Sequence, residues 1–286
     1  MYSISVPASS ANLGIGFDCI GMAVNLYDTF TIDRSDHWLL HGFSDDNDIE
    51  NNLFVHSYNL TSDYLHLKRQ MCDVSLEAEI PMSRGLGSSA ALILGGICSC
   101  NALNGFPLKQ EEILKLAISI EGHPDNVTPA LLGGLCISRN QTSIRKQISD
   151  KYRFGLWIPE YALSTEEARK ILPASYPRTD TVENIASALI GIDALIQGTD
   201  ENISFLMNDR IHEPYRKNLI PDYEIIRDFA LKNGALAFLI SGSGSTCLSI
   251  QKEKLNEISL PRTSVRWTYT DAEICYEGTR LWQKNT

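Results

Sequence analysis

The alternation of apolar and polar side chains predicts the elements near the middle of the chain. Residues 74–80 (VSLEAEI) alternate as a half-buried strand does. Residues 88–103 are apolar with few helix breakers until an Asn-Gly pair, which predicts a helix that stops there. Residues 109–121 place their apolar side chains on one face and are followed by a glycine, as in an amphipathic helix. A strand, a loop and two helices therefore follow one another.

The same alternation restarts after residue 152. Residues 154–159 (FGLWIP) predict a strand, and Ser164 and Glu167 form the capping box of a helix. A long amphipathic helix is predicted from the apolar positions Ile185, Ala188, Leu189, Ile192, Leu195 and Ile196. Further strands are predicted at 2–6, 27–33, 134–138, 235–240 and 247–250, and a further helix at 53–65. The mixed order indicates an α+β protein, and the restart predicts two domains, 1–152 and 153–286.

A glycine-rich loop joins the strand at 74–80 to the helix at 88–103. Its glycines allow backbone torsions closed to other residues, so successive N–H groups can converge on an anion at the helix N-terminus. The hydroxyls of Ser88 and Ser89 can bind a phosphate oxygen or a cation carried by the phosphates. The run expected to hold phosphates is Pro81, Met82, Ser83, Arg84, Gly85, Leu86, Gly87, Ser88, Ser89, Ala90 and Ala91. An ordinary strand-to-helix turn is the alternative interpretation.

Composition, charge and missing motifs exclude several classes of protein. The net charge is −10 and no basic patch is interleaved with aromatic residues, so no nucleic acid partner is expected. No apolar run approaches a membrane span, and the N-terminus lacks a basic start and an apolar block, so no membrane partner is expected either. Seven cysteines without paired spacing fit a reduced, cytoplasmic chain. The Gly-Lys-Ser/Thr P-loop, Gly-x-Gly-x-x-Gly and His-Arg-Asp are absent.

Two further segments collect polar groups that could carry chemistry. The loop PASSANLGIGFD holds Asn12 and Asp18 in a tight, glycine-containing turn, although such a loop is often only a turn. The segment EGHPDN ends a helix and brings a carboxylate, an imidazole and an amide together within six residues. A carboxylate near phosphates requires a cation between them, so Glu121 is a candidate Mg²⁺ ligand. A capping or salt-bridge role for Glu121 is the alternative.

Two arginines and a second glycine turn complete the candidates. Arg169 lies in the helix capped by Ser164, and Arg216 lies in HEPYRKNLIP. A guanidinium donates in a fork that fits a planar carboxylate, but most arginines are solvated surface residues. The turn SGSGST at 241–246 follows a buried strand, and its small residues permit close backbone approach to the phosphate loop or to a substrate. Simple packing explains it equally well.

Taken in chain order, these segments resemble the motifs of the GHMP kinases over nearly the whole chain. PASSANLGIGFD is similar to the N-terminal motif of that family, PMSRGLGSSAA to its phosphate motif, and SGSGST to its C-terminal glycine turn. Within the family, EGHPDNVTPALLGG, STEEARKILP and HEPYR resemble the branch that phosphorylates homoserine. The resemblance implies a ribosomal-protein-S5-domain-2-like N-terminal domain and a ferredoxin-like α/β sandwich as the C-terminal domain.

The resemblance also implies an activity and a role for each candidate residue. The reaction would transfer the γ-phosphate of ATP, with Mg²⁺, to the side-chain hydroxyl of L-homoserine, in an enzyme that is commonly a homodimer. The implied groups are these: Asn12 and Asp18 at the amino end of the substrate, His123 and Asn126 near its hydroxyl, Arg169 and Arg216 on its carboxylate, Ser88 or Ser89 with Glu121 on Mg²⁺, and Thr165 close to the γ-phosphate.

The chain departs from the family pattern in two places. Other branches carry a catalytic aspartate where this chain has Asn126, with Asp125 one residue away, and an amide cannot accept the hydroxyl proton. The reaction would then depend on in-line placement and charge neutralisation rather than on a side-chain base. The C-terminal turn carries Ser243 and Ser245 where alanine and proline are common. A kinase of another small alcohol, such as mevalonate, and a catalytically silent metabolite sensor are the rival functions.

Overall fold

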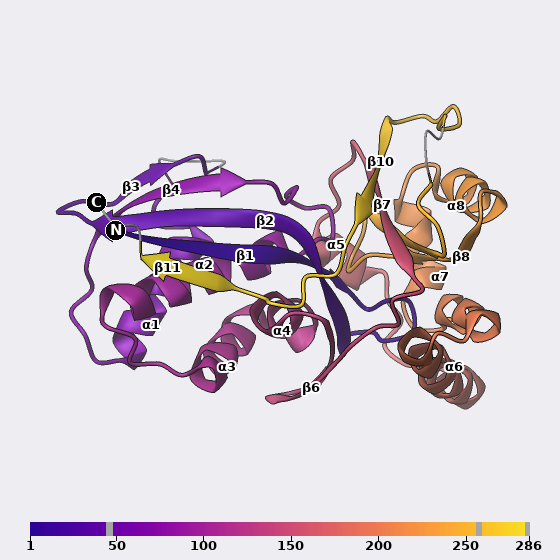
Figure 1. Ribbon diagram of the computed structural model, residues 1–286, viewed down its shortest axis with the longest axis horizontal. Helices are drawn as coiled ribbons and strands as arrows, with labels where there is room; N and C mark the ends of the chain where they lie inside the picture. Colours follow the sequence, from indigo (N-terminus) through magenta and orange to yellow (C-terminus); the bar gives the residue numbers. More distant parts are fainter. Residues whose placement is uncertain (44–47, 256–258, 284–286) are drawn as a thin grey trace.

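Two sheets organise the protein, as the computed structural model shows (Figure 1). The structure describes residues 1–43, 48–255 and 259–283. The first sheet runs in the order β11-β1-β2-β4-β3, with β5 paired to β2 and β6 to β5, and the second runs β10-β7-β9-β8. Their bounds are β1 Tyr2–Ala11, β2 Ile20–Arg34, β3 Leu39–His41, β4 Cys72–Ala78, β5 Leu135–Arg139, β6 Thr142–Lys146, β7 Arg153–Pro159, β8 Ala235–Ile240, β9 Cys247–Gln251, β10 Trp267–Ala272 and β11 Arg280–Gln283.

Helices accompany both sheets, which confirms the prediction of an α+β protein. Helices α1 to α4 lie along one side of the first sheet, and α5 to α8 lie with the second (Figure 1). Their bounds are α1 Leu53–Tyr64, α2 Ser88–Leu103, α3 Gln110–Glu121, α4 Pro124–Leu132, α5 Thr165–Lys170, α6 Arg178–Gln197, α7 Glu213–Arg216 and α8 Tyr223–Lys232. Two 3₁₀ helices, η1 Asp200–Met207 and η2 Lys217–Leu219, complete the described elements.

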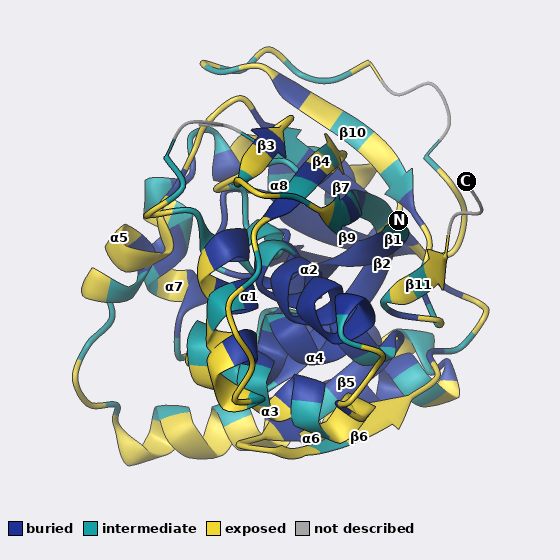
Figure 2. Cartoon of the chain, turned by 90° about the vertical axis from the view of Figure 1, so that its left-hand side faces the viewer, coloured by how far each residue is buried: buried dark blue, intermediate teal, exposed yellow. Residues whose placement is uncertain are grey.

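Helix α2 is the central helix of the first half and has the bounds predicted from the sequence. It is apolar all round because it is buried all round, between α1, α3 and strand β1 (Figure 2). Two glycines permit this packing. A Cβ at Gly95 would lie 2.6 Å from the Phe30 ring, and one at Gly96 would lie 2.3 Å from the carbonyl oxygen of Phe54. The helix that opens at the glycine-rich loop is therefore fixed in place along its length.

The last strand returns to the first sheet. β11 pairs antiparallel with β1, with Tyr2 opposite Gln283, so residues beyond the second sheet complete the edge of the first. Apolar side chains of both sheets, such as Ile4, Leu239 and Leu248, share one buried cluster. The division into domains 1–152 and 153–286 stays a prediction. Strand β11 belongs to the second of these ranges but pairs with β1 of the first.

Several elements differ from the sequence predictions. β1 and β2 are longer than the predicted strands at 2–6 and 27–33, because the segments that flank the PASSANLGIGFD loop also pair with each other. Helix α4 was not predicted; its Pro124 occupies the first turn, where no donor is lost. In α6, Ile192 and Leu195 are buried as expected, but Ile185 and Leu189 are 56% and 70% exposed.

Within the described residues, no helix is long and apolar enough to cross a membrane.

Candidate active site

A polar cavity lies where the glycine-rich loop meets the second glycine turn. It brings together thirteen of the residues singled out from the sequence: Asn12, Asp18, Ser83, Gly85, Gly87, Ser88, Ser89, Glu121, His123, Asn126, Thr165, Arg169 and Arg216. Asp125, Leu163, Gly242 and Ser243 complete its lining. The remaining loop residues, Pro81, Met82, Arg84, Leu86, Ala90 and Ala91, do not line it. Segments distant in the chain therefore converge on one cavity.

Strands β1 and β2 hold the glycine-rich loop through hydrogen bonds. The carboxylate of Asp28 on β2 accepts hydrogen bonds from the backbone N–H groups of Glu79 and Ile80, and the N–H of Ser9 on β1 donates to the carbonyl oxygen of Leu86. Burial raises the pKa of Asp28 to about 6, although the two N–H donors oppose that shift. The start and the middle of the loop are thus fixed to the sheet.

Gly85 and Gly87 take the left-handed backbone conformation that glycine favours, at φ +72° and +75°. Gly87 is the N-cap of α2, whose first-turn N–H groups have no acceptor within the helix, and Ser88 and Ser89 of that turn line the cavity. Leu86 points into the core and Met82 is 51% exposed. The loop therefore offers backbone and hydroxyl groups, rather than its larger side chains, to a ligand.

The second glycine turn packs directly on this loop. A Cβ at Gly85 would lie 2.2 Å from the carbonyl oxygen of Ser241, so only glycine permits the approach. The Ser241 hydroxyl donates to the carbonyl oxygen of Gly85 at 2.7 Å, and the N–H of Thr246 donates to that of Arg84 at 3.0 Å. Gly242 and Ser243 also line the cavity. The turn therefore packs on the loop, while its contact with a substrate stays a prediction.

Glu121 faces the hydroxyl groups at the start of α2. The Ser89 hydroxyl donates to Oε1 of Glu121 at 2.7 Å. Burial raises the pKa of the Glu121 carboxyl, while the Ser89 hydroxyl and the nearby His123 lower it. A carboxylate and serine hydroxyls beside a helix N-terminus form an all-oxygen donor set, which suits Mg²⁺ in the presence of phosphates. The donor chemistry therefore fits the ion, with the hydrogen bond made by Ser89 rather than by Ser88.

His123 and Asn126 are both held by neighbours. Nδ1 of His123 lies 2.6 Å from Oδ1 of the buried Asp125. Burial lowers the pKa of His123, but the Asp125 carboxylate outweighs it and leaves the pKa raised. Oδ1 of Asn126 accepts a hydrogen bond from the Ser9 hydroxyl at 2.9 Å. Asp125, the carboxylate next to Asn126 in sequence, thus bonds the imidazole of His123. The amide of Asn126 stands where other branches of the family carry the aspartate base.

Asp18 and Arg169 are joined to each other. Nη1 and Nη2 of Arg169 donate to the two carboxylate oxygens of Asp18 at 3.0 and 2.7 Å, a forked ion pair between residues 151 positions apart. This Asp18 bond is the main reason why the pKa of Arg169 is raised. Asn12 supports the pair, because its Oδ1 accepts from the N–H of Asp18 and its Nδ2 donates to the carbonyl oxygen of Gly242.

Arg216 is 1% exposed, and its hydrogen bonds within the described residues are to two backbone carbonyl oxygens and one imidazole. Its Nε donates to the carbonyl oxygen of Ala168 at 3.1 Å and its Nη1 to that of Gly242 at 3.0 Å. Among the residues that the structure describes, no carboxylate forms an ion pair with it. Burial, followed by the charge of Arg169, lowers its pKa to about 10, so it is still charged at neutral pH. The cavity therefore contains a buried cation that no carboxylate of the described residues bonds directly.

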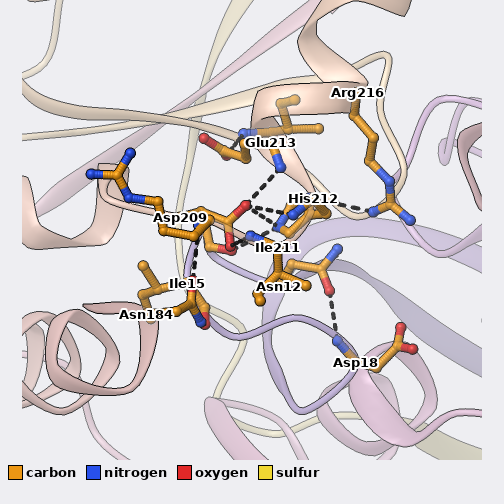
Figure 3. A network of polar contacts seen from close by, with 12 residues as sticks. Asn12, Ile15, Asp18, Asn184, Asp209, Ile211, His212, Glu213 and Arg216 are labelled. Carbon is orange, nitrogen blue, oxygen red and sulfur yellow. Dashed lines mark hydrogen bonds and ion pairs between the residues drawn. The ribbon is translucent and has the colours of Figure 1, made fainter. Parts of the chain in front are cut away.

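A buried network behind the cavity positions Arg216 (Figure 3). The carboxylate of Asp209 accepts from the N–H groups of His212 and Glu213 at the start of α7, and Nε2 of His212 bonds the carbonyl oxygen of Gly14 at 2.7 Å. Nδ1 of His212 faces Nη1 of Arg216 at 3.4 Å. Burial lowers the pKa of His212, which keeps the imidazole neutral beside the guanidinium.

An aromatic ring and a hydroxyl pair close the arrangement. The Phe17 ring stacks on His212 at 5.4 Å, and the guanidinium carbons of Arg216 and Arg169 lie 5.1 and 5.6 Å from its centroid. Thr165, at the start of α5, lies with its hydroxyl 3.4 Å from that of Ser243. Both arginines thus contact Phe17, and Thr165 faces the second glycine turn.

Glu213 gives the stability of this region a pH dependence. Burial raises its pKa from 4.5 to about 8, although it accepts a hydrogen bond from the N–H of Ile240. The folded chain therefore holds this proton more tightly than the unfolded chain, so the stabilisation is complete below pH 4.5 and is lost as the pH rises through about 8. We expect thermal unfolding of the wild type to shift down between about pH 6 and pH 9 relative to Glu213→Gln. Identical shifts in both proteins would contradict this.

Comparison with known proteins agrees with the cavity. The model described as "GHMP kinases N terminal domain" matches residues 52–134, and the one described as "GHMP kinases C terminal" matches residues 192–259. A homoserine kinase of Clostridium botulinum (strain Kyoto / Type A2) is 39% identical over 98% of both chains. The chain belongs to the GHMP kinase family. A homoserine kinase of Clostridium acetobutylicum is 40% identical over 88% of both chains. The crystal structure of homoserine kinase from Cytophaga hutchinsonii superposes with a TM-score of 0.85 at 25% identity, covering 98% of this chain and 96% of that one.

Leu163 lines the cavity of this GHMP kinase but was not found from the sequence. Four residues behind the lining were also not found: Ser9, Phe17, Asp209 and His212. Ser9 and Phe17 lie inside the PASSANLGIGFD motif, and His212 opens HEPYR, so the motifs themselves pointed to them. Asp209 precedes that motif and carried no signal, because its bonds to the N–H groups of His212 and Glu213 at the start of α7 are visible only in the fold.

Proposed function

We propose that this chain is an ATP-dependent homoserine kinase, which transfers the γ-phosphate to the side-chain hydroxyl of L-homoserine and releases O-phospho-L-homoserine and ADP. The single observation that carries the proposal is the charge pattern of the cavity. A carboxylate, Asp18, and two guanidinium groups, Arg169 and Arg216, line the same cavity as the phosphate loop. Among small alcohols, a free amino acid with a side-chain hydroxyl presents both an ammonium group and a carboxylate.

The ammonium and carboxylate groups of homoserine would bind charged side chains of the cavity. In the structure, two of these side chains are paired with each other and the third has no bonded carboxylate. Asp18 would take the ammonium group, with Asn12 holding the Asp18 backbone in place. Arg169 would turn part of its fork from Asp18 to the substrate carboxylate, and Arg216 would gain the anion that it lacks. Since both charges of the ligand are compensated, the desolvation of the buried Arg216 becomes less costly in the complex.

The phosphate end would be held by the loop and the first turn of α2. Backbone N–H groups from Ser83 to Ser89 would bind the phosphates, and Glu121 with Ser88 or Ser89 would hold Mg²⁺, which neutralises phosphate charge when bound. Asn126 and His123 would position the hydroxyl, and Thr165 would lie beside the transferred group. Because the transition state of phosphoryl transfer is loose, placement and charge neutralisation suffice without a side-chain base.

Further observations bear on the compartment, the kind of partner and the domain roles. All seven cysteines are free, which fits a reducing compartment and supports action in the cytoplasm. The small polar cavity fits a metabolite rather than a polymer. Residues 1–152 would hold the nucleotide and residues 153–286 would supply the arginines. A homodimer stays a prediction.

The proposal is tested by measuring ADP release with MgATP and a panel of alcohols: L-homoserine, L-serine, L-threonine, mevalonate and galactose. We expect turnover with homoserine that EDTA abolishes, and little with the others. Turnover with mevalonate or galactose alone would contradict the assignment of Asp18, because neither compound carries an ammonium group. Silence with all five alcohols would favour a metabolite sensor that has kept the fold.

Asp18 is expected to select for the ammonium group of the substrate. Relative to wild type, Asp18→Asn should lower kcat/KM for homoserine by about 10- to 100-fold, the cost of one charge-assisted contact. The value for 4-hydroxybutyrate, which lacks the amine, should change much less. Steady-state kinetics with both alcohols check this, with the exposed Asp36→Asn as the matched control. An equal loss for both alcohols would assign Asp18 to holding Arg169 alone.

A further inference from the structure

Ser9 is a fully buried residue of β1 that bonds two parts of the candidate active site at once. Its hydroxyl donates to Oδ1 of Asn126, which lies 117 positions away in the chain, at 2.9 Å. Its backbone N–H donates to the carbonyl oxygen of Leu86 in the phosphate loop at 3.0 Å. One residue therefore connects the loop that would hold the γ-phosphate with the amide that would face the hydroxyl of the substrate.

Gly87 of the phosphate loop packs directly on this hydrogen bond. A Cβ at Gly87 would lie 2.2 Å from the hydroxyl oxygen of Ser9 and 3.2 Å from Oδ1 of Asn126. Strand β1, the loop and helix α4 thus meet at one point, and a side chain at position 87 would push them apart. The amide is therefore held at a fixed distance from the loop by direct contact.

The same hydrogen bond determines which end of the Asn126 amide faces the cavity. A buried hydroxyl proton requires an acceptor, and Oδ1 of Asn126 is the acceptor that Ser9 has within the described residues. If the amide were reversed, its NH₂ group would donate to Ser9 and the hydroxyl proton would lose that acceptor. In the part of the chain that the structure describes, Nδ2 of Asn126 has no hydrogen-bond partner, and Asn126 lines the cavity. The N–H groups of the amide are therefore free for a ligand.

We infer that Ser9 is a positioning residue, which orients the Asn126 amide so that its NH₂ group donates to the side-chain hydroxyl oxygen of homoserine; the inference rests on the proposed function. With one lone pair of that oxygen bound to the amide, another forms the bond to the γ-phosphorus while the bond from phosphorus to the β,γ-bridging oxygen breaks. The hydroxyl proton is then free to pass to an oxygen of the transferred phosphate. A reversed amide would bind this proton through its carbonyl oxygen without being able to take it, and would hold it away from the phosphate.

Ser9→Ala removes the hydroxyl but keeps the backbone bond to Leu86. We expect kcat with homoserine to fall about tenfold or more while the KM for ATP stays nearly unchanged. Ser3→Ala is the matched control, since Ser3 is also buried on β1 but its hydroxyl has no partner within the described residues. A folded Ser9→Ala variant with the kcat of wild type would overturn the inference, whereas the proposed function depends on wild-type turnover alone and would stand.

A double-mutant cycle separates positioning from a general loss of packing. If Ser9 acts through Asn126, Ser9→Ala should lower kcat in the wild-type background and cause no further loss in the Asn126→Ala background. Losses that multiply in the double variant would overturn the inference, because Ser9 would then act independently of the amide.

NMR tests the orientation without any turnover, which covers the case of an inactive variant. The side-chain NH₂ group of Asn126 gives a pair of ¹H–¹⁵N signals, identified by their loss in Asn126→Ala. In wild type, L-homoserine should shift this pair, whereas L-2-aminobutyrate, which has the same charges but no hydroxyl, should not. Ser9→Ala should abolish the shift or broaden the pair, because the amide is free to reverse. The same shift with homoserine in both proteins would overturn the role of Ser9.

Discussion

Arg216→Ala should raise the KM for homoserine by about 10- to 1000-fold and leave the KM for ATP nearly unchanged. The range corresponds to about 1.5 to 4 kcal/mol for a charged contact that is lost in a desolvated site. The reason is that Arg216 is buried, charged and bonded directly to no carboxylate of the described residues, so the substrate carboxylate would be the group that pairs with it. Steady-state kinetics with each substrate varied in turn measure the effect.

Arg216 also bonds the backbone at Ala168 and Gly242, so a fall in stability must be separated from a loss of binding. Arg216→Lys keeps the charge but not the fork, and it should give an intermediate KM for homoserine. Arg210→Ala, on the same segment but exposed and outside the cavity, is the matched control and should behave as wild type. A folded Arg216→Ala variant with an unchanged KM for homoserine would remove Arg216 from the substrate site.

Glu121→Gln should lower turnover at limiting Mg²⁺ by at least about 10- to 100-fold, with partial recovery at high Mg²⁺. Glutamine keeps the volume and the acceptor for the Ser89 hydroxyl but removes the charge that the ion requires. Because burial raises the pKa of Glu121, the apparent affinity of wild type for Mg²⁺ should fall as the pH is lowered toward that pKa. The variant should lack this pH dependence. Kinetics at varied free Mg²⁺ and pH measure both effects.

Glu111→Gln is the matched control for this experiment, since Glu111 is exposed on the first turn of the same helix. It should leave the Mg²⁺ dependence of turnover unchanged. If Glu121→Gln matched wild type at limiting Mg²⁺, Glu121 would be a structural partner of Ser89 and would not be a metal ligand.

Local patterns predicted the elements whose neighbours lie close in sequence. The helix at 88–103 was found with correct bounds because its apolar run and its Asn-Gly stop are both local signals. Strand β11 was not predicted, since its pairing with β1 joins residues from opposite ends of the chain. Helix α6 was found, but two of the apolar positions that predicted it, Ile185 and Leu189, are exposed, because an apolar position does not reveal what covers it.

At the site, too, the sequence predicted what is local and missed contacts between distant segments. The motifs supplied the residues that line the cavity, including both arginines and Glu121. They did not supply the contacts between these residues. The bond between Asp18 and Arg169, and the choice of Ser89 as the partner of Glu121, depend on how α5 and α3 pack. Their catalytic and binding roles stay predictions until the variants are measured.

The most direct test of the central claim is to identify the product formed from L-homoserine and MgATP. ³¹P NMR and mass spectrometry of the reaction mixture should show a phosphate monoester on the side-chain oxygen of homoserine, formed in equal amount to ADP. This result would establish that the cavity places the hydroxyl, and not the carboxylate, against the γ-phosphate. An acyl phosphate, or ADP formed with free phosphate and no phosphorylated homoserine, would contradict the proposed arrangement of substrate and phosphate loop.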